Sequence, residues 1–244
     1  MSEPQFPDRY IDDLASIDPG DNYFIPVWNS VFDNGIRPTL LLDVGCGNGH
    51  FSAYAKRQTG CALYGVDGNR HALEAASAVG FTALEWADDF SRDALPFESS
   101  TFDFCLCKDL LEHLLSPCFV LQEINRVMQG NGHLLLHVPN HFPLFGRTKF
   151  LFTNNIDTFG YFPGSKSWNF PHIRFFTHQS LLELVALAGF QVLADLSFHF
   201  PAVPVLHRFG SGGMFIKRQL AKRCPSQFAE GFTLLLAKGN SSRD

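Results

Sequence analysis

Short apolar runs alternate with amphipathic segments through the first two thirds of the chain. Five apolar runs have the length of buried strands, at residues 39–45, 61–67, 81–86, 102–107 and 133–139. Helix-forming segments with one apolar face are found at residues 50–58, 69–80 and 116–130. Because each return from one parallel strand to the next needs a crossover connection, this order predicts a doubly wound α/β fold with a mostly parallel sheet.

Capping residues mark where two of the predicted helices begin and end. Asn69 can cap one helix, and Gly80 can end it. Ser116 and Pro117 have the cap and first-turn positions of the next helix, which Gly130 follows. These residues support the helix boundaries that the apolar pattern indicates.

The last third of the chain has a different order of elements. Thr177 and Gly189 bound a predicted helix. Two strands are predicted at residues 191–200 and 232–239, on either side of a loop-rich stretch with a short helix at 214–223. Because no full crossover unit joins these strands, they can pair antiparallel.

Length and charge narrow the classes of function. A chain of 244 residues, 45% of them hydrophobic, can bury one large core, so we expect a single domain over residues 1–244. The 19 Lys and Arg against 24 Asp and Glu give a net charge of −5, which disfavours nucleic acid as a partner.

No apolar run has the roughly 20 residues of a membrane span, and the first residues show no secretory pattern. The six cysteines lack the paired spacing of a metal site, so we expect a cytoplasmic protein with reduced thiols and no metal centre.

A glycine-rich turn, LLDVGCGNGH, follows the first predicted strand. Gly45, Gly47 and Gly49 occupy every second position, and glycine there lets the backbone approach a ligand. The spacing differs from the G-x-G-x-x-G of dinucleotide sites, and the carboxylate of Asp43 would repel a pyrophosphate. The turn therefore favours a positively charged ligand. Asp67, at the end of the next strand, can accept hydrogen bonds from ribose hydroxyls. A tight turn without a ligand and a helix-capping role for Asp67 are the alternatives.

Four motifs together resemble the class I S-adenosylmethionine-dependent methyltransferases. LLDVGCGNG, LYGVD, LPFESSTFDFCLCKDLLEHL and EINRVMQGNGHLLLHVPN occur in the order of that family. The resemblance implies S-adenosylmethionine as the cofactor and a Rossmann-like, seven-stranded sheet with one antiparallel strand. It implies contacts from three turns: Asp43, Gly45, Cys46, Gly47 and Gly49 at the methionine end, Asp67 and Gly68 at the ribose, and Asp88 or Asp89 at the adenine amino group. Of the last two we favour Asp88, although a longer stretch than usual follows the pair, and a solvated turn is the alternative.

Three histidines are candidates for removing a proton from the methyl acceptor. If the acceptor is a hydroxyl, the proton acceptors near the strand ends are His113, His141 and His172, and a structural role for His113 is the alternative. The sequence CKDLLEH lacks the N/D-P-P-Y/F run with which family members methylate amino groups of nucleic-acid bases. We therefore expect O-methylation of a small molecule, lipid or glycan, by a chain that can form a homodimer. A nicotinamide-dependent oxidoreductase and a catalytically inactive cofactor-binding partner protein are the alternative functions.

Aromatic residues are concentrated in residues 141–175. This segment is longer than an ordinary connection and more aromatic than a solvated loop. It is predicted to form a lid that gives the acceptor an apolar wall, and residues 201–229 are predicted to form a second cap. The alternative is that the rings extend the core or bury a dimer surface.

Overall fold

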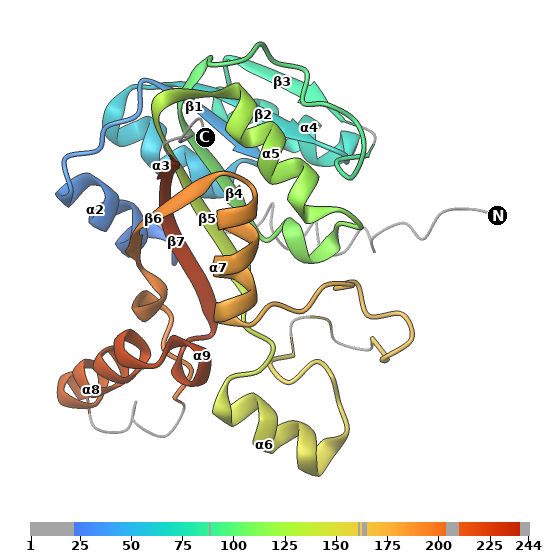
Figure 1. Ribbon diagram of the computed structural model, residues 1–244, viewed down its shortest axis with the longest axis vertical. Helices are drawn as coiled ribbons and strands as arrows, with labels where there is room; N and C mark the ends of the chain where they lie inside the picture. The colour runs from blue at the N-terminus through green and yellow to red at the C-terminus, as the bar shows by residue number, and fades with distance from the viewer. Residues whose placement is uncertain (1–21, 88, 161, 163–164, 204–209, 240–244) are drawn as a thin grey trace, which may run out of the picture.

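A seven-stranded sheet forms the centre of the protein. The computed structural model describes residues 22–239 except 88, 161, 163–164 and 204–209 (Figure 1). The strands lie in the order β3-β2-β1-β4-β5-β7-β6. Their bounds are β1 Leu40–Val44, β2 Ala62–Asp67, β3 Ala83–Trp86, β4 Phe102–Lys108, β5 Met128–Pro139, β6 Phe190–Asp195 and β7 Gly231–Lys238. Only β7 runs antiparallel to its neighbours, so the predicted fold class is confirmed.

Helices cover both faces of the sheet. Their bounds are α2 Ile25–Asp33, α3 His50–Thr59, α4 Arg70–Ala76, α5 Pro117–Val127, α6 Leu144–Thr153, α7 His178–Leu187, α8 Gly210–Arg223 and α9 Pro225–Phe228, with short 3-10 turns at η2 Ser77–Val79, η3 Leu111–His113 and η4 Ser197–His199. Neighbouring residues of β1 point to opposite faces: Leu42 packs in a core cluster with α5 and α7, and Leu41 packs in a second cluster with α2. Burial on both faces explains the continuous apolar runs of these strands.

The predicted caps at Asn69 and Thr177 are confirmed, whereas the Ser116 side chain makes no capping hydrogen bond and several boundaries move. The Asn69 side chain accepts from two backbone N–H groups at the start of α4, and Gly80 and Gly189 have positive φ at helix ends. α5 ends before Gly130 because β5 already begins at Met128, which pairs with Phe102 of β4. β6 ends at Asp195 instead of residue 200, and α8 begins four residues earlier than predicted.

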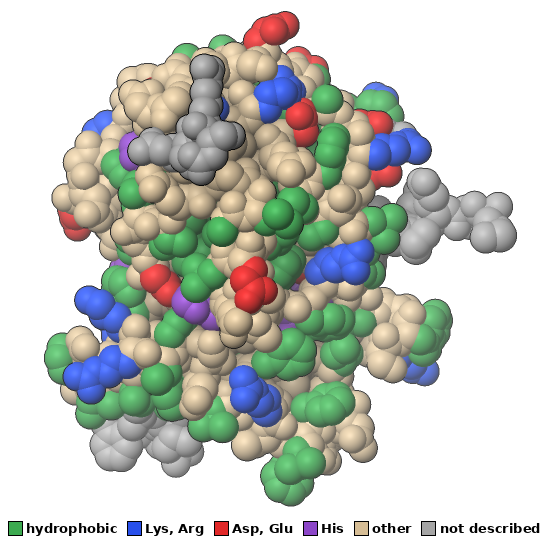
Figure 2. Space-filling model, in the orientation of Figure 1, with side chains coloured by type: hydrophobic (Ala, Val, Ile, Leu, Met, Phe, Trp, Pro, Cys, Tyr) green, Lys and Arg blue, Asp and Glu red, His purple; other side chains and the backbone are tan. Residues whose placement is uncertain are grey.

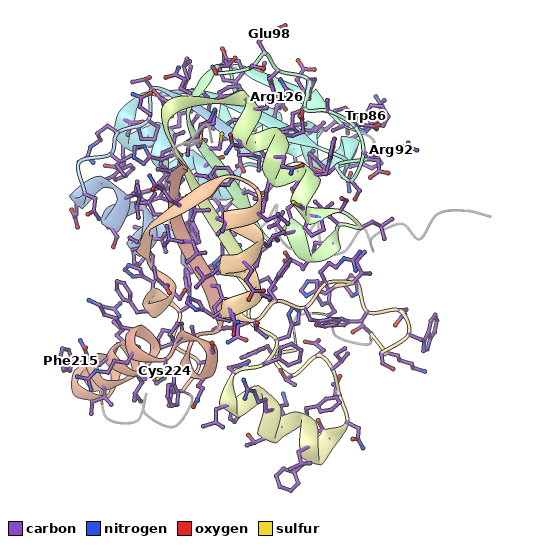
Figure 3. The ribbon with its side chains drawn as sticks, viewed as in Figure 1. Trp86, Arg92, Glu98, Arg126, Phe215 and Cys224 are labelled. Carbon is purple, nitrogen blue, oxygen red and sulfur yellow. The ribbon has the colours of Figure 1, made fainter. Side chains whose placement is uncertain are left out.

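The two predicted cap segments extend from the same end of the sheet. α6 lies in one of them and α8 and α9 in the other, and Figure 1 shows all three helices beyond the carboxyl end of β5. α6 packs against α9, and the Asn140 amide donates to the Ala229 carbonyl at 2.8 Å. In Figure 3, Trp86 and Arg92 lie at the β3 edge of the sheet, far from Phe215 and Cys224 on the α8 and α9 side. These three helices thus lie beyond one end of the sheet.

The aromatic rings of α6 do not extend the core. Phe150 and Phe152 are 48% and 84% exposed, and Trp168 after the helix is 81% exposed. Figure 2 shows hydrophobic side chains gathered over this lower part of the molecule. Within the described residues, no helix has the length and apolar character that crossing a membrane requires.

Candidate active site

The glycine turn after β1 is open on the side of its middle residue. Gly45, Gly47 and Gly49 have φ values of 74°, 50° and 76°, which favour glycine. A Cβ on Gly49 would lie 2.4 Å from the Phe81 ring, and one on Gly45 would lie 3.1 Å from the Leu110 side chain. A Cβ on Gly47 would meet nothing within 4 Å. Internal packing therefore requires the outer two glycines, while the middle one faces open space where a ligand can approach.

Asp43 gives this turn a buried carboxyl. Its side chain lies at the end of β1 and is almost fully buried. Burial raises the pKa of Asp43 to about 7, the hydrogen bond with Ser52 opposes this shift, and the charge of Asp67 adds to it. A cationic group beside Asp43 would favour the ionised form. The electrostatics of the turn thus suit a positively charged ligand.

Asp67 connects the glycine turn after β1 with the turn after β2. One carboxylate oxygen accepts from the Gly47 N–H and the other from the Asn69 N–H, each at 2.8 Å. Because Asn69 is the cap of α4, the capping alternative for Asp67 is wrong. Its oxygens keep lone pairs for ribose hydroxyls. Desolvation raises the pKa of Asp67, and the two N–H donors oppose this shift. Gly68, the next residue, would place a Cβ 3.2 Å from the Ala87 carbonyl oxygen.

Replacing Asp67 by alanine is expected to weaken S-adenosylhomocysteine binding by about 1.5–3 kcal/mol, the range for hydrogen bonds to a charged group. Calorimetric titration measures this loss. Asp103→Ala is the matched control, because the Asp103 carboxylate accepts from the backbone of Thr39 and Leu40 at the opposite end of β1. Equal affinities for the two variants would show that another residue holds the ribose.

Three further residues, Asp88, Asp89 and Cys46, were predicted to contact the cofactor. Asp88 lies outside the described residues. The carboxylate of Asp89 accepts from the Ser91 N–H at 2.8 Å and pairs with Arg92, so it stabilises a local turn. Its role toward adenine stays a prediction. The buried Cys46 donates its backbone N–H to the Val66 carbonyl, and burial raises the pKa of the Cys46 thiol, so this thiol is neutral.

The three predicted histidines lie together at the end of β4. The ring centroids of His113 and His172 are 4.7 Å apart, and those of His141 and His172 are 4.9 Å apart. His141 Nε2 and His172 Nδ1 share a hydrogen bond of 2.6 Å. Burial lowers the pKa of His141 to about 4 and that of His172 to about 3, and it also lowers the pKa of His113. All three rings are therefore neutral at physiological pH.

Backbone contacts bring His172 to the turn after β4. The Glu112 carbonyl accepts from the N–H groups of Ile173 and Arg174, at 2.9 and 3.0 Å. The Pro171 carbonyl lies 3.2 Å from His113 Nδ1. The Arg174 guanidinium donates to the carbonyls of residues 114 and 115. Residues 171–174 are thus fixed against η3.

Two acidic residues in this region were not predicted as site residues. Glu112 is fully buried, and neither of its carboxylate oxygens has a hydrogen-bond partner among the described residues. Asp109 has a φ of 51°, pairs with the buried Lys108, and lies 3.5 Å from His137 Nε2. Desolvation opposes the ionisation of Asp109, but Lys108 and His137 hold its pKa below the usual value. The sequence signal for this region was the spacing of acids in DLLEH directly after a buried strand.

An apolar cavity of about 230 Å³ lies beside the histidine cluster. All eight residues of its wall come from the segment 141–175: His141, Phe142, Gly146, Arg147, Phe150, Ile156, Thr158 and Phe175. His141 is the only one of the three histidines in this wall. Since its ring also contacts His172, His141 connects the cavity to the polar cluster.

Known proteins with similar sequences or structures include methyltransferases. A family model described as a methyltransferase domain, Methyltransf_23, matches residues 25–195. A ubiquinone biosynthesis O-methyltransferase of Haemophilus ducreyi is 28% identical over 115 residues, which cover 44% of this chain and 48% of that protein. A protein of the same name from Vibrio cholerae is 24% identical over 190 residues, covering 73% and 71%. The chain spans about half the length of several of these curated relatives.

The fold is shared with a solved methyltransferase of an archaeon. The crystal structure of a SAM dependent methyltransferase from Archaeoglobus fulgidus aligns with a TM-score of 0.63 at 15% identity, over 96% of this chain and all of that chain. This likeness concerns the fold, whereas the family model covers well over half of the sequence. The chain therefore belongs to the methyltransferase domain family and carries an S-adenosylmethionine-dependent methyltransferase domain.

Proposed function

We propose that the protein methylates a hydroxyl group of an apolar small molecule or lipid. The observation that carries this proposal is the position of His141, which lines the apolar cavity and hydrogen-bonds to His172. An acceptor with its apolar part in the cavity presents its polar end to the histidine cluster. A glycan has no apolar body to match this wall, so it is the less suitable of the predicted acceptors.

The positions of the residues predicted to bind the cofactor agree with an acceptor whose polar end faces the histidine cluster. A Cβ on Gly45 in the glycine turn would meet the Leu110 side chain, and η3 with His113 begins at the residue after Leu110. A methionine end bound at Gly45, Gly47 and Gly49 thus lies beside the histidine cluster. The residues of this chain then have two tasks, which are to align the acceptor oxygen with the activated sulfonium methyl and to exclude water.

A hydroxyl acceptor explains the polar side of the site. Its oxygen must lose a proton as the bond to carbon forms, and neutral imidazoles can accept or direct that proton. The named activity of the curated relatives is O-methylation, which agrees with this choice. Residues 141–175 act as a lid over the acceptor, and residues 201–229 support that lid through the contact between α6 and α9.

The test uses purified protein, labelled S-adenosylmethionine and three acceptors: a phenol with an alkyl chain, the same phenol without the chain, and the matching alkylated aniline. Mass spectrometry identifies the methylated atom. We expect the alkylated phenol to gain one methyl group on its oxygen and to react at least about 10-fold faster than the short phenol. A factor of ten corresponds to about 1.4 kcal/mol, which contact between the alkyl chain and the cavity wall can supply. Transfer only to the amine would overturn the proposal, as would cofactor binding without any transfer.

The cavity wall gives a prediction with a control on the same helix. Phe150→Ala removes a ring that lines the cavity, whereas Phe152→Ala removes a ring that is 84% exposed and outside its lining. We expect Phe150→Ala to raise the KM of the alkylated phenol about 10-fold, because part of a phenyl contact is lost. Affinity for S-adenosylhomocysteine should not change. A similar KM for both variants would mean that the acceptor binds elsewhere.

A further inference from the structure

The polar cluster contains a buried carboxyl group, that of Glu112, whose oxygens have no hydrogen-bond partner among the described residues. The residue has no exposed surface. A buried polar group without a partner costs about 1–3 kcal/mol, and more when it is charged. Such groups are rare in folded proteins, and an ordered water, a bound ion or a catalytic role can account for them. Glu112 therefore offers two buried carboxyl oxygens that a cation could use.

Two imidazoles face the same point. Glu112, His113 and His172 each offer one ligand atom, and these atoms lie within 4.8 Å of one another. Glu112 Oε1 and His113 Nε2 are 4.0 Å apart. A cation about 2.0–2.2 Å from each ligand requires ligand atoms roughly 3–4.4 Å apart. Small rotations of these side chains are enough to close the site.

The second nitrogens of both rings have partners that orient them for a metal. A carbonyl oxygen only accepts, so the hydrogen bond with Pro171 places the proton on His113 Nδ1 and leaves the lone pair on Nε2. His172 Nδ1 lies 2.6 Å from His141 Nε2, and when His172 Nδ1 donates its proton to His141 Nε2, the lone pair of His172 Nε2 is available to a metal. A metal-binding histidine commonly uses one nitrogen for the metal and the other for a hydrogen bond of this kind.

Nearby charge also favours a cation. Asp109, three residues before Glu112, interacts electrostatically with Glu112, His113 and His172. Lys108 pairs with Asp109 beside the rings of Phe24 and Phe51, and its charge also acts on Glu112. Carboxylate and imidazole ligands together suit Zn²⁺, Mn²⁺ and Fe²⁺ more than Mg²⁺ or Ca²⁺.

We propose that Glu112, His113 and His172 bind one divalent cation of the Zn²⁺, Mn²⁺ or Fe²⁺ class, and that this cation binds the acceptor oxygen. The second part rests on the proposed function, whereas the first does not. As the oxygen binds the cation, its proton leaves to water, because His113 and His172 then act as metal ligands and not as proton acceptors. An oxygen lone pair then forms the bond to the methyl carbon while the carbon–sulfur bond breaks, which gives the methyl ether and S-adenosylhomocysteine. The site lies next to the acceptor cavity, to which His141 connects it, and outside the cofactor turns.

Cobalt binding tests the site without any acceptor. The full chain is freed of metal with a chelator and titrated with Co²⁺, whose visible absorption reports imidazole and carboxylate ligation. We expect one Co²⁺ per chain, displaced by one Zn²⁺. Glu112→Gln and His172→Asn should each lower the Co²⁺ affinity at least about 100-fold. This loss is larger than the one expected when a residue that only hydrogen-bonds a metal ligand is replaced. His71→Asn is the control, because His71 is exposed and lies on α4.

Binding of S-adenosylhomocysteine shows that each variant is folded. If Glu112→Gln does not fold, His172→Asn and His113→Asn give the same comparison. Absence of saturable Co²⁺ binding by the unaltered chain would overturn the proposal, as would equal affinities in the folded ligand variants and the control. Stoichiometric Co²⁺ binding without methylation of any phenol would keep the metal site and reject the proposed function.

Discussion

Replacing Asp43 by asparagine is expected to stabilise the ligand-free protein at pH 8 and to weaken its binding of S-adenosylmethionine. In the unfolded chain the Asp43 carboxyl has its ordinary pKa of 3.8, whereas burial raises the folded pKa to about 7. A raised acid pKa favours folding at low pH, and this stability is lost as the pH rises from about 4 to about 7. The loss amounts to up to about 4 kcal/mol above pH 7, and the neutral amide of an asparagine side chain avoids it.

Urea unfolding at pH 5 and pH 8 measures this effect. The variant should exceed the original protein in unfolding free energy at pH 8 and should approach it at pH 5. Calorimetry should also show that S-adenosylmethionine binding by the original protein strengthens from pH 6 to pH 8, because Asp43 must be ionised to attract a cation. The variant should lack this dependence. A destabilised variant at pH 8 would show that the ionised carboxylate is already compensated without the cofactor.

Gly47→Val is expected to reduce S-adenosylhomocysteine affinity by at least about 100-fold, or ~2.7 kcal/mol. The new side chain would occupy the open face of the turn, where no atom of the described chain lies within 4 Å of the added Cβ. Valine at a φ of 50° also strains the backbone by about 1–2 kcal/mol. The experiment must separate the effect of this backbone strain from the effect of a side chain that prevents the ligand from binding.

Gly60→Val provides that separation. Gly60 has a φ of 70°, and a Cβ there also meets nothing within 4 Å, but it follows α3 at the opposite end of the sheet. Both variants should lose similar unfolding free energy, and only Gly47→Val should lose the cofactor. Retained affinity in a folded Gly47→Val protein would show that the ligand does not approach this turn.

Local patterns in the sequence were enough to predict the sheet and the turns that follow β1 and β2. Alternating elements and capping residues specify neighbours in the chain, and the acids at the ends of β1 and β2 are found directly from the strand ends. The unpredicted α2 also had a readable signal, since buried residues repeat at helical spacing in Phe24, Val27, Trp28 and Val31. Its Pro26 lies at the first turn, where proline is compatible with a helix.

The contacts of the polar cluster could not be predicted in this way. The sequence suggested His113 and His172 separately, but nothing in their separation of about 60 residues places both beside Glu112. That arrangement depends on the hydrogen bonds of Ile173 and Arg174 to the Glu112 carbonyl. The missing partner of Glu112 is likewise a property of the packed structure, because any glutamate in a sequence can find a partner.

The attachment of residues 171–174 to η3 has a consequence for how new specificities can arise. Backbone N–H groups form the two bonds to the Glu112 carbonyl, so they do not depend on which side chains the segment carries. Substitutions or insertions in residues 142–170 can therefore reshape the wall around an acceptor while His172 keeps its place. Selection can exchange one acceptor for another in this half of the molecule and leave the methyl donor's half unchanged.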